Sequence, residues 1–554
     1  MSVSQRFGAK EIRQYTFKVG LSRTEGGLLE LVAEAYTFVL SGLVLLTMAG
    51  TIIVGLRNSL GVGTESALVA SVVSPGFHSV TLTQASATVL LTLAAALLSV
   101  EMTVGPVTMT VPQTSWWLGL PVRRRGFIQP GFLKSLIWPA VAGILVVAPL
   151  SLGTAGTTNP GNIALATLCG IGLAWLLYGI AAWCQITGKG KWLKTVAGTI
   201  TLVAPLTLVG TALYNNIAGS LAVTAAHVRW MEYLPTSWPL LVANGKLWPL
   251  VIILAALAVL ALAFRNLERI TTASLKAAAA AGAYVAGSLM SMDATELSRS
   301  LGGGAAQGTT KIRLPMIFHR GSATTRSIKT LISTHATMAL RSPVTILRAL
   351  VLAAIPASLA AIEFLGNAIL IAVVLFFCAH FAVTSWGATA RFAAGNPAAD
   401  ALMPLPAKTV RRVHWVVPAV GMTLWALCCF SLLLALGVGS PELLVLAVLA
   451  GPGLGAATVR AGFRPAPDWT MPAVASPSGP IPTGAIRAFL IGPDLTLIVL
   501  LPVLICLIAG GVPPVAFTAQ LILSWLAFLW GTHVRKPKSA HDGGMFGMPA
   551  NPAK

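Results

Sequence analysis

The sequence contains little charge. Only 10% of its 554 residues are charged and 56% are hydrophobic, and the mean hydropathy is +0.81. Soluble domains carry about 25% charged residues. The composition therefore excludes a soluble multidomain protein and predicts that lipid surrounds most of the chain.

Several catalytic motifs are absent as well. The sequence has no GxxxxGK[ST] phosphate-binding loop, no HExxH zinc motif and no GxSxG nucleophile turn, so we expect neither nucleotide hydrolysis nor another enzymatic activity in this chain. The six cysteines form no CxxC pair and lie in or beside apolar stretches, which is typical of packing residues. No metal or cofactor is predicted. The first thirty residues are polar and mixed in charge, so no cleavable secretion signal is expected.

What the sequence does contain is a series of long apolar windows. A helix needs about 20 apolar residues to cross a hydrocarbon core about 30 Å thick. Twelve windows approach this length. They cover residues 35–56, 82–104, 133–152, 163–184, 196–214, 247–264, 346–362, 368–390, 413–436, 443–459, 495–509 and 515–530.

The basic residues are distributed unevenly between the loops. The chain carries 37 lysines and arginines against 16 acidic residues, a net charge of +21. If the amino terminus is cytoplasmic, the outer loops contain only Arg57, Arg229 and Lys246, which leaves 34 basic residues on the inner side. This bias follows the positive-inside rule. It predicts twelve spans, two cytoplasmic termini and no nucleic-acid partner.

A short pattern occurs twice, in the loop after the second span and in the loop after the eighth. Each loop contains Leu-Pro and then a basic cluster, and the next span contains Pro-Ala-Val. A helix break followed by topogenic charge would explain one such loop, but the recurrence favours a shared task. Because proline readily starts a helix, each loop is expected to contain a short cytoplasmic helix. The residues are Leu120, Pro121, Arg123, Arg124 and Arg125 in the first loop, and Leu405, Pro406, Lys408, Arg411 and Arg412 in the second.

These patterns predict an all-α polytopic membrane protein with about 12 transmembrane helices in two parallel six-helix repeats. The predicted divisions are an amino-terminal cytoplasmic arm with an interfacial helix (1–34), a first six-span half (35–264), a cytoplasmic linker (265–345), a second six-span half (346–530) and a cytoplasmic tail (531–554). The linker is read as a helix around its alanine run followed by a flexible glycine-rich stretch, and the proline-rich inner loop 460–482 as irregular.

Three further segments carry functional hypotheses. Glu101 and His380 are ionisable residues within predicted spans and are functional candidates by default. Two other interpretations stay open: Glu101 forms a boundary salt bridge with an arginine such as Arg123, and His380 is a neutral histidine bonded to a backbone carbonyl. In the outer loop before the sixth span, Leu234, Pro235 and Trp238 indicate a broken helix that dips back into the membrane.

On these features the chain resembles the permeases of ABC exporters of the ABC-2 type, also called type V or ABCG-like. The resemblance implies an amphipathic connecting helix before the first span, matched by residues 7–19, and a coupling helix between the second and third spans, matched by the two basic loops. It also implies a re-entrant segment before the sixth span, matched by residues 234–238 and lacking in the second half. The fused halves and the Ala- and Gly-rich composition look like actinobacterial exporters of antibiotics and other amphiphiles.

The resemblance also implies partners and a location. One fused chain would pair with two copies of a separately encoded P-loop ATPase, which would bind the ATP and Mg, while this chain binds no cofactor. The cargo would be a hydrophobic or amphipathic small molecule moved out across the bacterial plasma membrane. An ion-driven secondary transporter of the major facilitator type is the alternative. That class shares the six-plus-six spans, but its Gly-x-x-x-Asp-Arg-x-Gly-Arg signature is not matched between residues 120 and 125.

Overall fold

The computed structural model describes ten stretches of the chain: residues 8–23, 82–154, 159–218, 233–290, 321–362, 367–395, 404–464, 474–476, 479–481 and 491–534. These stretches are helical except for a short hairpin of strands β1 (Val474–Ser476) and β2 (Gly479–Ile481). This hairpin corrects the expectation that the whole inner loop 460–482 is irregular. The predicted span 35–56 and the glycine-rich part of the linker lie outside the described residues.

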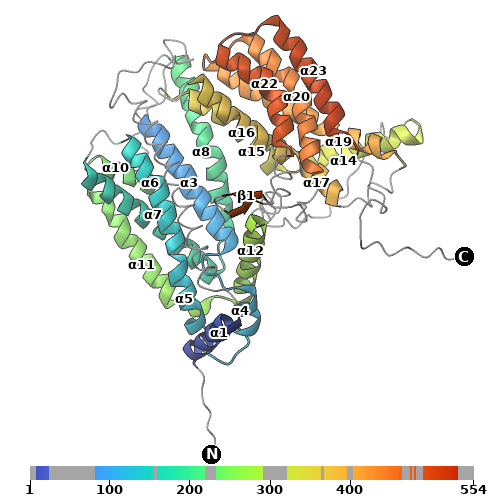
Figure 1. The fold of residues 1–554 in the computed structure, drawn as a ribbon. Helices are drawn as coiled ribbons and strands as arrows, with labels where there is room; N and C mark the ends of the chain where they lie inside the picture. The colour runs from blue at the N-terminus through green and yellow to red at the C-terminus, as the bar shows by residue number, and fades with distance from the viewer. Residues whose placement is uncertain are drawn as a thin grey trace, which may run out of the picture.

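The helices of the first half lie together on the left of Figure 1, and those of the second half lie at the upper right. The first group comprises α1 (Ala9–Arg23), α3 (Leu82–Val104), α4 (Val111–Trp116), α5 (Arg125–Ser135), α6 (Ile137–Thr154), α7 (Pro160–Thr187), α8 (Lys191–Ala218), α10 (Trp238–Ala243), α11 (Val251–Arg265) and α12 (Thr272–Met290), with the 3-10 turns η1 (Pro235–Ser237), η2 (Trp248–Leu250) and η3 (Leu267–Arg269). The second comprises α14 (Ala323–Leu340), α15 (Pro343–Ala360), α16 (Ala368–Trp386), α17 (Ala388–Gly395), α19 (Ala407–Ala435), α20 (Pro441–Gly462), α22 (Pro493–Ala509) and α23 (Pro514–Gly531).

Ten helical segments in the described part of the chain are long and apolar enough to cross a membrane, and α22 is a shorter apolar helix. All eleven coincide with windows predicted from hydropathy. The protein is therefore a multi-pass helical membrane protein. The ten segments are Gln84–Val104, Arg125–Leu152, Pro160–Thr187, Lys191–Asn215, Trp248–Arg265, Pro343–Ala360, Ala368–Trp386, Ala407–Ala435, Pro441–Gly462 and Pro514–Gly531.

Local sequence sets where these helices begin and end. The side chain of Asn159 accepts a hydrogen bond from the Gly161 backbone and caps α7, and Asn367 caps α16 in the same way. Gly188 ends α7 and Gly510 ends α22 in the left-handed conformation that glycine adopts without strain. Capping residues and glycines therefore fix these span boundaries in the fold.

Two predicted spans, the third and the eighth, are interrupted at the end that adjoins a basic loop. The third span divides into α5 and α6 because Pro139 cannot donate to the carbonyl four residues back, so α5 ends at Ser135. The eighth predicted span, 368–390, ends four residues early at Trp386, and α17 follows after Gly387. By contrast, α19 continues through Pro418 without a break.

Small residues bring the helices of each half close together. In the first half α6 packs on α7, α7 on α11 and α3 on α8. In the second half α19 packs on α20, α20 on α23 and α16 on α22. A Cβ atom at Gly455 of α20 would lie 2.5 Å from the Cα of Ala419, and one at Gly170 of α7 would lie 2.5 Å from Val147. Glycine at these points is what allows the close contact.

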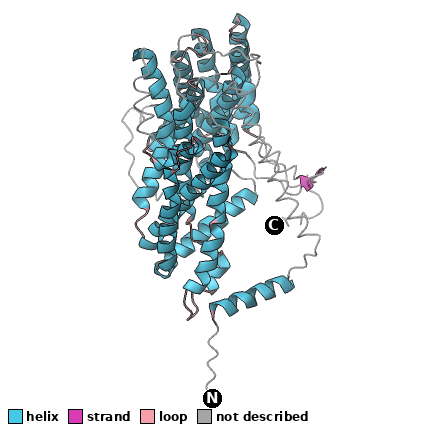
Figure 2. Cartoon of the chain, turned by 90° about the vertical axis from the view of Figure 1, so that its left-hand side faces the viewer, coloured by secondary structure: helices cyan, strands magenta, loops and turns pink. Residues whose placement is uncertain are grey.

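The two halves meet through α8 and α15. Leu208, Val209 and Ala212 of α8 belong to the same buried cluster as Ala353 and Ala357 of α15. The helix next to the marked amino terminus in Figure 2, α1, lies crosswise to the long helices. It rests on α5, where a Cβ atom at Gly126 would lie 2.6 Å from the Cβ of Ala9.

Candidate functional site: the basic end of the helices

The arginine-rich loop of the first half is folded around the short helix α4. Thr110 accepts a hydrogen bond from the backbone of Gln113 at 3.4 Å, and the Gln113 side chain accepts one from the Thr110 backbone at 3.0 Å. This reciprocal capping box fixes the start of α4. A short helix between the second and third predicted spans therefore exists, as the proline-containing loop indicated.

Aromatic packing holds this loop against the ends of the spans. The rings of Trp117 and Phe127 stack with centroids 5.2 Å apart. Phe127 and Leu118 are buried in a cluster that includes Leu275 of α12, and α12 also packs against α4. The loop is therefore a packed platform on the lower end of the first half (Figure 1).

The predicted coupling residues of this loop differ in exposure. Leu120, Pro121, Arg123 and Arg124 are exposed on the platform, whereas Arg125 is half-buried at the start of α5. The Arg125 guanidinium lies 5.6 Å from the centre of the Phe264 ring. Only Arg123 and Arg124 therefore present charge that a partner could meet.

The basic cluster of the second half is built differently. Leu405 packs on a small cluster with Leu331 of α14 and Val410 of α19, and Pro406 precedes the first residue of α19. Lys408, Arg411 and Arg412 lie on α19 itself. The basic residues therefore belong to the span itself and not to the loop before it. The described short helix on this side, α17, precedes the cluster.

Both halves place an arginine of the third span over a phenylalanine near the end of the sixth. Arg412 of α19 lies 5.9 Å from the ring centre of Phe528 of α23, as Arg125 does over Phe264 of α11. The distances fit weak cation–π contacts. The sequence repeat places these two arginines at corresponding positions of the two halves. No sequence feature marks Phe264 and Phe528 as their aromatic partners.

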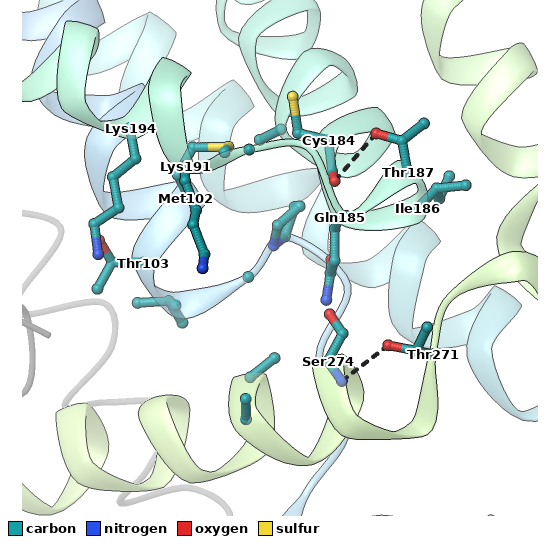
Figure 3. Close-up of a pocket in the computed structure, with 18 residues that line it drawn as sticks. Met102, Thr103, Cys184, Gln185, Ile186, Thr187, Lys191, Lys194, Thr271 and Ser274 are labelled. Carbon is teal, nitrogen blue, oxygen red and sulfur yellow. Dashed lines mark hydrogen bonds between the residues drawn. The ribbon is translucent and has the colours of Figure 1, made fainter. Parts of the chain in front are cut away.

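A cavity of about 340 Å³ lies beside the first platform, at the ends of α3, α7, α8 and α12. Its wall combines apolar groups with Gln185 and the two lysines Lys191 and Lys194. In Figure 3 the side chains of Lys191 and Lys194 point down from α8, on the side of the cavity where α12 lies. Gln185 lies above Ser274 of α12. The volume is at the lower end of the range of about 300–1,000 Å³ typical of ligand pockets.

Gly105, in the turn after α3, joins this cavity to the platform. Its φ is +85°, and a Cβ atom there would lie 2.8 Å from the Cβ of Ala278 on α12. Gln185 holds the same turn by donating to the Val107 carbonyl at 3.1 Å and accepting from the Val107 backbone at 3.0 Å. The turn, α12 and the cavity therefore form one packed unit.

Replacing Gly105 by alanine should destabilise the protein by about 2–4 kcal/mol, because a left-handed alanine is strained and its methyl group would collide with Ala278. Gly188→Ala is the matched control: its φ is +71°, but no atom lies within 4 Å of the added methyl group. It should cost about 1 kcal/mol. Unfolding midpoints in mild detergent compare the two variants, and equal losses would contradict the packing argument.

The carboxylate of Glu101 is buried near the end of α3. Its Oε2 atom has no hydrogen-bond partner among the described residues, and the described part of the chain contains no ion pair between Glu101 and Arg123. On the neighbouring helix α7, the hydroxyl of Tyr178 hydrogen-bonds Ser135 and donates to the Pro106 carbonyl at 3.0 Å. The boundary salt bridge envisaged with Arg123 is therefore not formed here.

His380 of α16 lies close to a charged group that the sequence analysis missed. A Cβ atom at Gly492 would lie 3.8 Å from the Cε1 atom of His380, and the Nδ1 atom of His380 has no hydrogen-bond partner within the described stretches. Asp494 pairs with Arg460 at 2.6 Å and also accepts from the backbone of Gly492 at 2.8 Å. Thirty-four residues separate Arg460 from Asp494, so only the fold brings these two charges together.

The Arg460–Asp494 pair is expected to stabilise the second half. The side chains are only 14% and 28% exposed, so removing one partner leaves a poorly hydrated charge. Arg460→Gln and Asp494→Asn should each cost about 2 kcal/mol, and the double variant should cost clearly less than their sum. Denaturation of the four proteins in the same detergent measures this coupling. Additive losses would show that the pair contributes nothing beyond its separate members.

The segment before the sixth span forms a broken helix. Leu234 precedes η1 (Pro235–Ser237), and Trp238 begins the six-residue helix α10, which packs against α7. The rings of Trp238 and Trp248 meet edge to face with centroids 5.0 Å apart. The residues named from the sequence thus come together, and the chain then turns directly into α11.

The described residues contain no group of three or more histidine, cysteine, aspartate or glutamate side chains that could hold a metal. All six cysteines are free thiols. The fold and these sites define a polytopic helical membrane protein with a packed basic platform at one end of its spans.

Residues 78–472 match the model of DUF6297, a family of unknown function. The chain therefore belongs to this family. No curated protein and no solved structure matches the chain at a significant level.

Proposed function

We propose that this protein is the permease subunit of an ATP-binding cassette exporter, with the basic end of the helices facing the cytoplasm. The observation that carries the proposal is the packed platform around α4, which lies between the helices α3 and α5 and presents Arg123 and Arg124 to the surface. A crosswise helix, α1, precedes the platform, and a broken helix, α10, precedes the last span of the same half. This order matches the connecting, coupling and re-entrant elements implied by the resemblance.

The recurrence of contacts supports two parallel repeats of six spans. The pairs α6–α7, α7–α11 and α3–α8 correspond in order to α19–α20, α20–α23 and α16–α22. In each half a tryptophan also joins the third and fourth spans: the indole of Trp175 donates to the Leu136 carbonyl at 3.1 Å, and that of Trp415 donates to the Pro452 carbonyl at 2.9 Å. An amphipathic helix, α14, precedes the second half as α1 precedes the first.

The packing suggests how a push on the platform would reach the spans. Nucleotide-driven closure of two ATPase subunits would press on the α4 platform in the first half and on the basic start of α19 in the second half. Movement of α4 would pass through Gly105 and Val107 to α3, and directly to α12. Because α6, α7 and α11 are closely packed, we expect the halves to rock as units about the α8–α15 contact.

The proposed cargo class rests on the apolar character of the spans. The buried residues of the long helices are predominantly apolar, with only scattered threonine, serine, glutamine and histidine side chains. A path formed between such spans would suit a hydrophobic or amphipathic small molecule better than a sugar or a free ion. We therefore propose a drug-like, antibiotic-like or lipid-like cargo, exported across the bacterial plasma membrane.

The test is to purify the tagged full chain gently from its native membrane and to identify stoichiometric partners by mass spectrometry. A P-loop ATPase at two copies per chain is the expected result. A chain that transports without any ATPase would overturn the proposal in favour of an ion-driven carrier. In that case Glu101 and His380, whose Oε2 and Nδ1 atoms are buried without a hydrogen-bond partner among the described residues, become the residues to replace.

A further inference from the structure

The third span of the first half is interrupted at a single residue, Leu136, which joins α5 to α6. The backbone N–H of Leu136 donates to the carbonyl of Lys134 rather than to the carbonyl four residues back. Pro139 has no N–H group, so the Ser135 carbonyl lacks its helical partner as well. Sharp kinks in long helices almost always lie at such prolines. The span has therefore lost two successive backbone bonds at this joint.

A single hydroxyl, that of Tyr178 on α7, ties both ends of the segment that carries the platform. It donates to the carbonyl of Pro106 at 3.0 Å, and it hydrogen-bonds the Ser135 side chain. The chain between Pro106 and Ser135 contains α4 and nearly all of α5. Tyr178 is only 2% exposed, so water does not readily replace these bonds. The hydroxyl therefore closes the base of the platform.

Trp175 supports the joint from the same side of α7. Its indole N–H donates to the Leu136 carbonyl at 3.1 Å, whereas the backbone N–H of Ala140 lies 3.4 Å from that carbonyl. Residues three apart lie on the same face of a helix, so Trp175 and Tyr178 meet the joint together. Side chains of α7 thus replace the backbone bonds that the third span has lost.

The two sides of the joint are held in different ways. On one side α6 packs closely on α7, because a Cβ atom at Gly143 would lie only 2.9 Å from the Gly170 carbonyl oxygen. On the other side α5 belongs to the platform, where Phe127 stacks on Trp117. Helices α6 and α7 therefore form a fixed pair, and α5 is the part that can move with α4.

The second half is built differently at the corresponding position. Helix α19 continues through Pro418 as one helix of 29 residues. Its Trp415 donates to the Pro452 carbonyl of α20, so the indole joins two helices and supports no break. A joint like that at Leu136 is thus not found in the described third span of the second half.

We propose that the joint at Leu136 is a hinge and that Tyr178 is the latch that holds the platform against α7. When the Tyr178 hydroxyl releases Pro106 and Ser135, α4 and α5 swing as one body while α6 stays on α7. The platform of the first half then moves relative to its own spans, whereas the basic start of α19 moves only with its span. The proposal concerns this chain alone and holds whether or not an ATPase partner exists.

The test is hydrogen–deuterium exchange of the full chain in mild detergent, followed by mass spectrometry of its peptides. Tyr178→Phe removes the hydroxyl and keeps the ring, which packs on Phe132 with centroids 5.5 Å apart. Because two buried hydrogen bonds are lost, residues 111–135 should open about tenfold more often and exchange about tenfold faster. Residues 140–152 of α6 should keep their rate.

Two further variants separate a latch from a general loss of stability. Tyr214→Phe removes an exposed hydroxyl from α8 and should change the exchange of neither segment. Ser135→Ala should accelerate residues 111–135 less in the Tyr178→Phe protein than in the unchanged protein, because the bond between the two hydroxyls is already gone.

The remaining outcomes overturn the proposal. Unchanged exchange of residues 111–135 in Tyr178→Phe would show that this hydroxyl does not hold the platform. Equal acceleration of residues 111–135 and 140–152 would exclude a hinge at Leu136, since the whole span would then loosen. An equal effect of Tyr214→Phe would assign the change to the loss of any hydroxyl. If Tyr178→Phe does not fold, Ser135→Ala alone is compared with the unchanged protein over the same two segments.

Discussion

Reversing the charges of Arg123 and Arg124 should abolish the stimulation of the partner ATPase by this chain. Both side chains are exposed on the α4 platform, where they would meet acidic groups of the ATPase in the proposed complex. Glutamates in their place would face like charges, which costs several kcal/mol at an interface. We expect the ATPase rate of the Arg123→Glu/Arg124→Glu complex to fall to that of the ATPase subunit alone. Arg125 is left intact because it packs over Phe264.

Two exposed cations elsewhere at the same end provide the control. Lys189 follows α7 and Arg269 closes η3, and both are exposed. The Lys189→Glu/Arg269→Glu chain undergoes the same change of charge without altering the platform. It should still bind the ATPase subunit and stimulate its ATPase rate. Membrane insertion of both variants is checked by fractionation. Full stimulation by the Arg123→Glu/Arg124→Glu chain would rule out the platform as the point of coupling.

Acidification should weaken the second half through His335 of α14. His335 is 5% exposed, and its ring stacks on that of His414 with centroids 4.4 Å apart. Burial first, and then the neighbouring His414, lowers the pKa of His335 from 6.5 to about 4. Between these two values the unfolded chain binds more protons than the folded one. The free energy of unfolding should therefore fall as the pH falls from 6.5 to 4, by about 3 kcal/mol in total, and then level off.

Variants separate this histidine from other acid-sensitive groups. His335→Gln should flatten the pH dependence between 6.5 and 4, because the titrating group is gone. His533→Gln removes an exposed histidine and should retain the slope of the unchanged protein. Denaturation in detergent at a series of pH values gives the three curves. A slope that persists in His335→Gln would assign the acid sensitivity to other residues.

The spans could be predicted because their signal is local. Each window is apolar over about 20 residues, which hydropathy alone detects. The amphipathic helix α14 was not predicted, since 323–340 is rich in threonine and carries charge. Its apolar side is recognisable only when its neighbours are known: Leu331 is buried against Val410 and Val413 of α19.

The candidate sites were predictable only where a pattern repeats along the chain. The recurrence of Leu-Pro and arginines identified the α4 platform, and the prolines near Trp238 identified the broken helix. The partners of the charged residues were not accessible in this way. Arg460 and Asp494 lie at the edges of different spans, and Phe463, which holds Arg411, has no sequence feature that marks it. Such contacts depend on how distant helices pack.

The glycine contacts between α19 and α20 have a consequence for how the protein assembles. Only a short turn, residues 436–440, separates these two helices, and Gly451 and Gly455 bring them together along their length. Contacts so near in sequence close a small loop and form early. This hairpin can therefore assemble during synthesis, before α22 and α23 emerge from the ribosome. Helix α23 then docks on α20, where Gly531 meets Ala456. The second half would grow in the membrane around a nucleus that needs nothing from the first.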